Sequence, residues 1–236
     1  MRGYFLCMLC VGLLASGCYK NGRFQSPDDL FPKTPLPDST LVDVHYGGND
    51  KQTMDVYLPA NRTRQTRLIV IIHGGGWSAG DKSDFNNYVA EFKTRLPEYA
   101  IANLNYRLVV NQTNRFPTQE NDIKSAITHL KDKAASYTIS SDMILLGISA
   151  GAHLALLQAY KHADIVQPRG VVSFYGPTDL AALYISSLPT VLKSITGFTV
   201  DENPTIYKES SPIQYVSASS APTLLLQGDA DMLVPL

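Results

Sequence analysis

The stretch Gly147-Ile148-Ser149-Ala150-Gly151 directly follows the apolar run Met143–Leu146 and precedes the helix-compatible run Ala152–Leu157. Strand, turn and helix in this order are the context of the G-x-S-x-G pattern, which presents a serine hydroxyl above the edge of a sheet. The turn is strained, and the helix passes close to the strand only if the flanking residues lack bulk. The pattern predicts a nucleophilic Ser149, with a plain glycine-rich turn as the alternative.

The remainder of the folded region alternates short apolar runs with helical periodicity, which is typical of β-α-β units around a mostly parallel sheet. An antiparallel edge pair is predicted from Leu41–Tyr46 and Met54–Leu58. Thr118–Ala135 has apolar residues at helical spacing, and Thr118, directly after Pro117, is predicted as the helix N-cap. Five nearly continuous apolar runs predict strands covered on both faces: Leu68–Ile72, Ala100–Leu104, Met143–Leu146, Val171–Phe174 and Thr223–Leu226.

A second motif, His73-Gly74-Gly75-Gly76-Trp77, directly follows the predicted strand that ends at Ile72. Three successive glycines at a strand end let backbone N–H groups face a ligand that a β-carbon would block, and this suits an oxyanion hole. A flexible glycine loop is the alternative. Because open parallel sheets carry their chemistry at the carboxyl ends of the strands, we expect both motifs to meet at the same edge.

Composition excludes several classes of function. The 236 residues include 20 Lys plus Arg against 21 Asp plus Glu, and only 17% of residues are charged, so there is no electrostatic footprint for nucleic acid or for polybasic membrane docking. Three cysteines are too few for a disulfide framework or a thiolate metal site. We expect an ordinary globular protein with no nucleic-acid partner, no metal and no cofactor.

The N-terminal segment has the features of an export signal. One arginine precedes the apolar run Tyr4–Ala15, which is too short for a membrane span of roughly 20 residues. The stretch Leu14–Cys18 resembles the lipobox of bacterial lipoproteins, in which Cys18 is acylated and becomes the first mature residue; an ordinary cleaved signal peptide is the alternative. The resemblance implies export to the bacterial cell envelope, in the periplasm or at the outer membrane, with membrane contact only through the lipid anchor.

Domain boundaries follow from composition. Residues 1–17 are predicted as the lipoprotein signal peptide. Residues 18–40 lack apolar periodicity and are rich in proline, so they are predicted as an extended tether. Residues 41–236 are predicted as one domain.

The order of further short motifs carries a resemblance to a known superfamily. They are Asp55-Val56-Tyr57-Leu58-Pro59, Gly80-Asp81-Lys82, Asn105-Tyr106-Arg107-Leu108, Tyr175-Gly176-Pro177-Thr178-Asp179 and Gln227-Gly228-Asp229-Ala230-Asp231. With the two glycine motifs, residues 41–236 resemble the α/β-hydrolase superfamily, and within it the HGGG-type serine esterases similar to secreted acetyl- and feruloyl-esterases. The resemblance implies a mostly parallel sheet with helices on both faces. It also implies hydrolysis of small-molecule or carbohydrate esters through an acyl-enzyme.

The resemblance assigns roles to single residues. Ser149 is the nucleophile, and the N–H groups of Gly75, Gly76 and Ala150 stabilise the oxyanion. Asp231, which follows Gly228 at the spacing G-x-x-D after the Thr223–Leu226 run, is the acid of the triad. Asp229 is the weaker candidate and is read as a turn residue.

The base of the triad is where the chain departs from the family pattern. The superfamily has the order serine, acid, histidine, and no histidine follows Asp231. His73 is predicted to brace the oxyanion loop, His153 to lie in a packed helix, His129 on an amphipathic helix, and His45 and His162 at the surface or an edge. We therefore expect a domain that is incomplete at its C-terminus, lacks the last strand and helix and is inactive as given. A catalytically inactive binding lipoprotein is the alternative from another class, and a peptidase of the same fold, against which the HGGG loop argues, is a second one.

Three further features bear on the site, and two of them, Asp179 and Trp77, have two readings each. Asp179 is predicted to cap a helix from Leu180, with a substrate contact as the alternative. The connection 180–215 is long, and such an insertion is expected over the active site, where it shapes substrate choice. Trp77 is read either as a wall of an aromatic acyl or sugar site or as packing.

Overall fold

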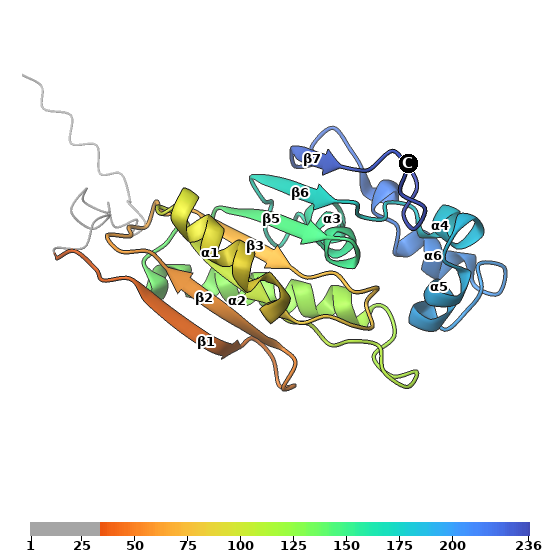
Figure 1. Ribbon diagram of the computed structural model, residues 1–236, viewed down its shortest axis with the longest axis horizontal. Helices are drawn as coiled ribbons and strands as arrows, with labels where there is room; N and C mark the ends of the chain where they lie inside the picture. Colours follow the sequence, from red (N-terminus) through yellow and green to blue (C-terminus); the bar gives the residue numbers. More distant parts are fainter. Residues whose placement is uncertain (1–33) are drawn as a thin grey trace, which may run out of the picture.

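The structure, a computed structural model, describes residues 34–236 (Figure 1). The predicted signal peptide, the predicted lipidation site Cys18 and the tether up to residue 33 lie outside the described residues. The last part of the predicted tether is attached to the domain, because the N–H of Asn61 donates to the carbonyl of Leu36 at 2.8 Å. The first strand begins at Ser39, two residues before the predicted boundary.

The described residues form one seven-stranded sheet in the order β1-β2-β4-β3-β5-β6-β7. Neighbours from β4 to β7 are parallel, while β1 pairs antiparallel with β2 and β2 with β4. The mostly parallel sheet and its antiparallel edge pair confirm the prediction. In chain order the strands are β1 (Ser39–His45), β2 (Thr53–Leu58), β3 (Leu68–Ile72), β4 (Ala100–Leu104), β5 (Met143–Ile148), β6 (Gly170–Phe174) and β7 (Thr223–Leu226).

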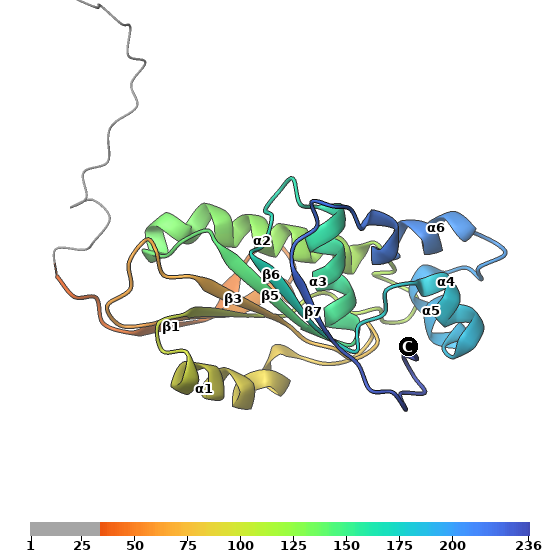
Figure 2. The ribbon, with the colours of Figure 1, turned by 90° about the horizontal axis from the view of Figure 1, so that it is seen from above.

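Helices cover both faces of the sheet (Figure 2). Helices α2 (Thr118–Tyr137) and α3 (Ala150–Lys161) lie on one face, and α1 (Asn86–Arg95) lies on the other after a short 3-10 helix, η2 (Lys82–Phe85). The predicted apolar stripe of α2 is buried, as Ile127 and Leu130 show at 0% exposure. Both faces of β3 and β4 are buried, which explains their continuous apolar sequences.

The predicted N-cap of α2 is wrong. Pro117 occupies the cap position without a side-chain hydrogen bond, and Thr118 is already the first helical residue. The N–H of Thr118 donates to the carbonyl of Arg115 at 3.0 Å, so the preceding turn satisfies this donor without a hydroxyl cap.

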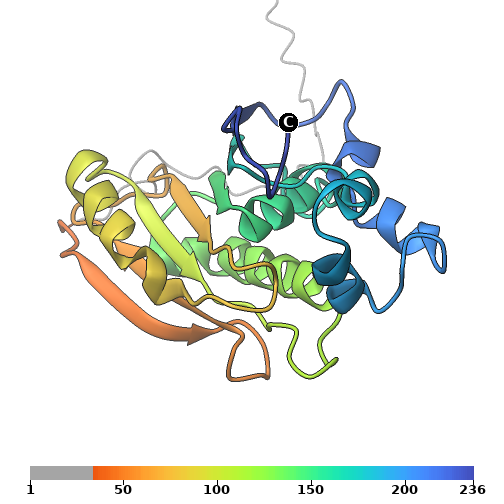
Figure 3. The same cartoon turned by 45° about the vertical axis from the view of Figure 1, so that its right-hand side comes forward.

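The connection 180–215 folds into short helices at the carboxyl end of the sheet, close to the last residues of the chain (Figures 1 and 3). Asp179 caps the first of these helices, accepting from the N–H groups of Ala181 and Ala182 at 2.9 and 3.0 Å, and this confirms the capping prediction. The helices are α4 (Leu180–Ser186), α5 (Pro189–Thr196), α6 (Pro204–Glu209) and the 3-10 helix η3 (Pro212–Tyr215). Of the helices formed by residues 34–236, none combines the length and apolar character needed to cross a membrane.

Candidate active site

Ser149 lies in the tight turn between β5 and α3. Its φ of 53° and ψ of −120° are unusual for a residue with a side chain, and such backbone strain costs about 1–3 kcal/mol. The N–H of Ser149 donates to the carbonyl of Phe174 at 2.8 Å, and its own carbonyl accepts from the N–H of His153 at 3.0 Å. The neighbouring strand and the following helix therefore hold the strained turn on both sides.

The two glycines of the motif are required by close packing. A β-carbon on Gly147 would overlap the backbone of Ala152, and one on Gly151 would overlap the carbonyls of Ile72 and His73. The helix thus crosses directly over the ends of β5 and β3, as the sequence pattern predicts. This crossing places the start of α3 beside the glycine loop that follows β3.

The glycine loop lies against Ser149. A β-carbon on Gly74 would stand 3.3 Å from Cβ of Ser149. Gly75 and Gly76 have φ values of +107° and +57°, and the carbonyl of Gly75 accepts from the N–H groups of Ser78 and Ala79 at 3.2 and 2.9 Å. The loop is therefore an ordered turn next to the serine.

The N–H groups assigned to the oxyanion hole are available to a ligand. Within the described part of the chain, those of Gly75, Gly76 and Ala150 donate no hydrogen bond to another protein group. Ala150 is the first residue of α3, so its N–H has no intrahelical partner and carries the positive end of the helix dipole. Three unused donors near one serine are what a developing oxyanion needs.

His73 braces this loop, as predicted. Its ring is stacked on Tyr106 with centroids 4.3 Å apart and planes 10° apart, and Nδ1 lies 2.7 Å from the carbonyl of Gly74. The hydroxyl of Tyr106 donates to the carbonyl of His73 at 3.0 Å. Burial lowers the pKa of His73. A neutral ring held by its own loop acts as a support.

A buried ion pair involves Lys82, which follows the glycine loop in the chain, and sequence reasoning gave it no role. Nζ of Lys82 contacts the carboxylate of Asp55, and its backbone N–H donates to the side chain of Asn105 at 2.6 Å. A β-carbon on Gly80 would stand 2.7 Å from Nδ1 of His73. Asp55, Lys82 and Asn105 all belong to the short motifs that carry the family resemblance. Their spacing in the sequence does not show that they contact one another.

His153 is part of the core and does not face the serine hydroxyl. Its Nδ1 accepts from Nε1 of Trp77 at 3.2 Å, and its Nε2 lies 2.7 Å from the carbonyl of Ser210. Burial lowers its pKa from 6.5 to about 4. Trp77 is only 2% exposed, so of its two readings packing is right and the substrate wall is wrong.

The remaining histidines do not approach the site either. His162 was predicted at the surface or an edge, but its side chain is only 14% exposed and Nε2 contacts the buried carboxylate of Glu120. This correction reflects a buried pair that the sequence spacing does not reveal. His45 is exposed on β1, and His129 lies on α2. No hydrogen bond joins the hydroxyl of Ser149 to an imidazole among residues 34–236.

Asp231 follows β7 at the same edge of the sheet as Ser149. Its Oδ1 accepts from the N–H groups of Leu233 and Val234 at 2.8 and 2.9 Å, and its Oδ2 accepts from Nε2 of Gln227 at 3.1 Å. The backbone hydrogen bonds from Val234 and Leu233, of which the bond from Val234 has the larger effect, lower the pKa of Asp231. The carboxylate is thus ordered and ionised, although no histidine lies between it and the serine in the described residues.

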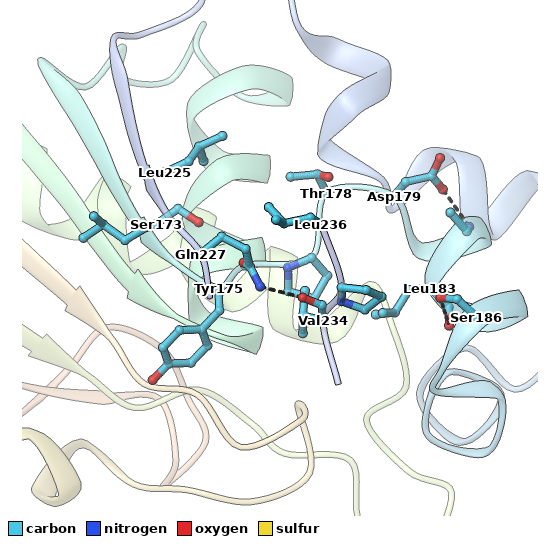
Figure 4. Close-up of a pocket in the computed structure, with 15 residues that line it drawn as sticks. Ser173, Tyr175, Thr178, Asp179, Leu183, Ser186, Leu225, Gln227, Val234 and Leu236 are labelled. Atoms are coloured by element: carbon cyan, nitrogen blue, oxygen red, sulfur yellow. Dashed lines mark hydrogen bonds between the residues drawn. The ribbon is translucent and has the colours of Figure 1, made fainter. Parts of the chain in front are cut away.

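A pocket of about 590 Å³ lies between the ends of β6 and β7, helix α4 and the final residues (Figure 4). Its wall includes Tyr175, Leu183, Leu225, Gln227 and Val234, and Gln227 donates to the carbonyl of Val234. Ser149 does not line it. Within the described residues, no cluster of three His, Cys, Asp or Glu side chains could hold a metal ion.

Comparisons with known proteins agree with this geometry. The chain is 24% identical to esterase LipC of Mycobacterium tuberculosis over 89% of its own length and 59% of that protein, and 26% identical to esterase LipQ of the same organism over 82% and 49%. It therefore spans about half the length of the curated relatives that it matches. A solved truncated carbohydrate esterase from gut microbiota has a TM-score of 0.73 at 22% identity and covers 87% of this chain and 82% of that one, which shows the fold. The BD-FAE family model matches residues 54–236, and the chain belongs to the BD-FAE family, with the α/β-hydrolase fold.

Proposed function

We propose that the protein is a serine carboxylesterase that works through an acyl-enzyme. The observation that carries the proposal is the strained Ser149 beside the three unused N–H donors of Gly75, Gly76 and Ala150. The similarity to esterases and to a carbohydrate esterase supports this class of reaction. Carbohydrate esters with acetyl or feruloyl groups are the proposed substrates.

In the first half of the reaction, Oγ of Ser149 attacks the carbonyl carbon of the ester as its proton passes to a base. The carbonyl oxygen becomes an oxyanion, which the three N–H groups stabilise. The intermediate then expels the alcohol, which takes up the proton, and an acyl group remains on Ser149. In the second half, water gives a proton to the base as its oxygen attacks the acyl carbon. The bond between this carbon and Oγ of Ser149 then breaks, Oγ recovers the proton from the base, and the carboxylic acid leaves.

Asp231 is proposed as the acid that orients the base. We propose that none of the five histidines of residues 1–236 is that base, because His73 and His153 are fixed by core hydrogen bonds and the others lie away from Ser149. Replacing His45, His129, His153 and His162 singly by glutamine in the full-length gene product should leave turnover within about tenfold in every folded variant. His73→Gln removes the brace of the oxyanion loop and should cost no more than the roughly 10² to 10³ that one lost donor costs. A folded variant that loses roughly 10⁴ or more would identify the base and overturn this part.

The esterase assignment is tested by turnover of 4-nitrophenyl acetate in the full-length gene product. Ser149→Ala should remove roughly 10⁶ of turnover, whereas Ser173→Ala is the matched control, because its hydroxyl is buried and has no hydrogen-bond partner. Equal activity of native protein and Ser149→Ala would contradict the proposal. Absence of any turnover in the native protein would favour the inactive binding protein instead.

We also propose export and lipidation at Cys18, which places the domain at the bacterial cell envelope on a proline-rich tether. Mass spectrometry of the mature N-terminus should find an acylated cysteine followed by Tyr19. A mature protein that begins elsewhere and lacks the acyl chains would reduce this segment to an ordinary signal peptide.

A further inference from the structure

The imidazole of His153 is a buried polar group near the nucleophile, and the proposed reaction gives it no role. His153 is 0% exposed and lies one turn after Ser149 in α3. Its backbone N–H donates to the carbonyl of Ser149 at 3.0 Å, so the ring projects from a turn that is bonded directly to the strained serine. A polar ring in a core is stable only where its nitrogens find partners, so those partners indicate what the ring does.

The two ring nitrogens make hydrogen bonds of opposite sense. The indole N–H of Trp77 can only donate, so Nδ1 of His153, at 3.2 Å, is the acceptor. The carbonyl of Ser210 can only accept, so Nε2, at 2.7 Å, is the donor. Burial lowers the pKa of His153 from 6.5 to about 4, which keeps the ring neutral. The two partners thereby fix both the tautomer and the orientation of the ring.

Trp77 is the residue that ends the glycine loop of the oxyanion hole. It directly follows Gly76, and its φ of 59° is a left-handed conformation that a residue with a side chain adopts at a cost. Its ring meets the imidazole of His153 edge to face, with centroids 5.1 Å apart and planes 86° apart. Its carbonyl accepts from the N–H of Val109 at 3.0 Å. Contacts of the ring and of the backbone therefore hold Trp77 in its strained conformation.

Two anchored residues flank the glycine donors. His73 stands before them and is braced by its aromatic stack, and Trp77 stands after them and is bonded to His153. Gly75 and Gly76 lack side chains that could contact the core, and a glycine backbone adopts many conformations. The placement of their N–H groups therefore depends on the residues at the two ends of the loop.

We propose that His153 is a positioning residue of the active site, which holds the N–H donors of Gly75 and Gly76 in place beside Ser149 through its hydrogen bond with Trp77. The inference rests on the proposed esterase function and adds a supporting residue to it. The backbone of His153 is bonded to Ser149 and its ring to Trp77, so it links the nucleophile turn to the donor loop. Loss of this link misaligns donors that act on the oxyanion, and such a loss lowers kcat with little effect on KM.

Three substitutions test the hydrogen bond in the full-length gene product with 4-nitrophenyl acetate. Trp77→Phe keeps an aromatic ring and removes the donor. His153→Gln reaches Ser210 with its terminal amide but has no acceptor at the place of Nδ1, whereas His153→Asn puts its amide oxygen at that place and keeps an acceptor for Trp77. We expect Trp77→Phe and His153→Gln to lower kcat about three- to tenfold, the net value of one neutral hydrogen bond. KM should stay within about twofold in both, and His153→Asn should keep kcat within about twofold of the native value.

A double variant and a control separate this link from a general loss of stability. Trp77→Phe combined with His153→Gln should lose no more kcat than the larger single loss, because both remove the same bond. Tyr207→Phe is the matched control, because it removes a buried hydroxyl that donates to the carbonyl of Phe198 at 2.8 Å. It should be less stable in urea and keep the native kcat. Native kcat in the two single variants, losses that multiply in the double variant, a His153→Asn as impaired as His153→Gln, or an equal loss in Tyr207→Phe would overturn the proposal.

Hydrogen exchange tests the positioning without any turnover. The N–H of Ala79 donates to the carbonyl of Gly75 at 2.9 Å, so its exchange rate, measured by NMR, reports on the order of the loop. Trp77→Phe and His153→Gln should speed this exchange about three- to tenfold, and Tyr207→Phe should not. Such a response in a protein without esterase activity would refute the proposed function and leave the support of the loop intact. Unchanged exchange in both variants would overturn the positioning itself.

Discussion

Two adjacent glycines of the oxyanion loop offer a sharp test, because they share a positive φ but differ in the space around them. A β-carbon on Gly75 would overlap the carbonyl of Ala79, whereas one on Gly76 meets only Val191, at 3.9 Å. The φ of Gly76, +57°, lies in the left-handed region that alanine adopts at a cost of about 1–2 kcal/mol. The φ of Gly75, +107°, lies outside that region.

Gly75→Ala should therefore displace the loop and misplace at least one N–H donor. Loss of one donor of an oxyanion hole lowers kcat by about 10² to 10³, or roughly 2.7–4 kcal/mol of transition-state stabilisation. Gly76→Ala should keep the loop in place and lower kcat by less than about tenfold. Both variants should remain folded, because the loop lies above the core sheet.

The assay compares kcat and KM for 4-nitrophenyl acetate in the full-length gene product, with urea unfolding as the control for stability. A loss confined to kcat in Gly75→Ala identifies an interaction made in the transition state. Equal losses in the two variants, or a larger loss in Gly76→Ala, would refute the assignment of the hole. Native turnover in Gly75→Ala would remove Gly75 from it.

Three further substitutions test the supports of the site. Burial lowers the pKa of His153 from 6.5 to about 4, so the unfolded state binds the extra proton and the free energy of unfolding falls as the pH drops from about 6.5 toward 4. Between pH 7 and pH 5 this fall amounts to about 2 kcal/mol. In urea unfolding, His153→Gln should lose this pH dependence, and an unchanged pH dependence would contradict the account. Arg107→Ala leaves the fully buried Asp122 without its charged partner, with Gln52 still donating to the carboxylate, and should lower the free energy of unfolding by about 3–5 kcal/mol. The exposed control Arg95→Ala should lower it by less than about 0.5 kcal/mol, and similar losses in the two variants would contradict this. Gly151→Ala should lower the denaturation midpoint far more than Gly170→Ala, because only the first β-carbon overlaps backbone, and a tolerated Gly151→Ala would argue against the close helix crossing.

The centre of the sheet could be predicted because β3 and β4 are buried on both faces. The runs Leu68–Ile72, Ala100–Leu104 and Thr223–Leu226 match β3, β4 and β7 to the residue. Continuous apolar sequence follows from double-sided burial in β3 and β4. The prediction that Thr223–Leu226 is covered on both faces is wrong: β7 is the last strand of the described sheet, and its three leucines are 54%, 59% and 39% exposed. The strand β5 continues to Ile148, two residues beyond its predicted end, because the pairing with β6 extends to that residue.

The short helices could not be predicted in the same way. Helix α1 buries only Val89 fully, so its sequence carries a weak apolar stripe. Helices α4 and α6 have seven and six residues, too few for a clear period, and they are defined by the caps Asp179 and Asn203 and by tertiary contacts. The capping aspartate was the one signal that sequence reasoning used correctly in this region.

The candidate site was predictable to the extent that strain and close packing select residue types. Close packing requires glycine at positions 147 and 151, and the strained turn holds Ser149 between them. These requirements fix the residue types and can therefore be recognised in the sequence. The contacts of Trp77 with His153 and of Lys82 with Asp55 join segments far apart in the chain. Such pairs depend on the folded arrangement of several elements, so the spacing of residues in the sequence does not predict them.

The central claim, that Ser149 is the nucleophile, is tested most directly by the site of covalent labelling. The full-length gene product is incubated with an excess of a fluorophosphonate probe, digested, and mapped by mass spectrometry. The account predicts a phosphonyl group on the peptide that contains Ser149, on no other serine, and its complete loss in Ser149→Ala. A label on a different serine, a label that survives Ser149→Ala, or an unlabelled native protein would contradict it.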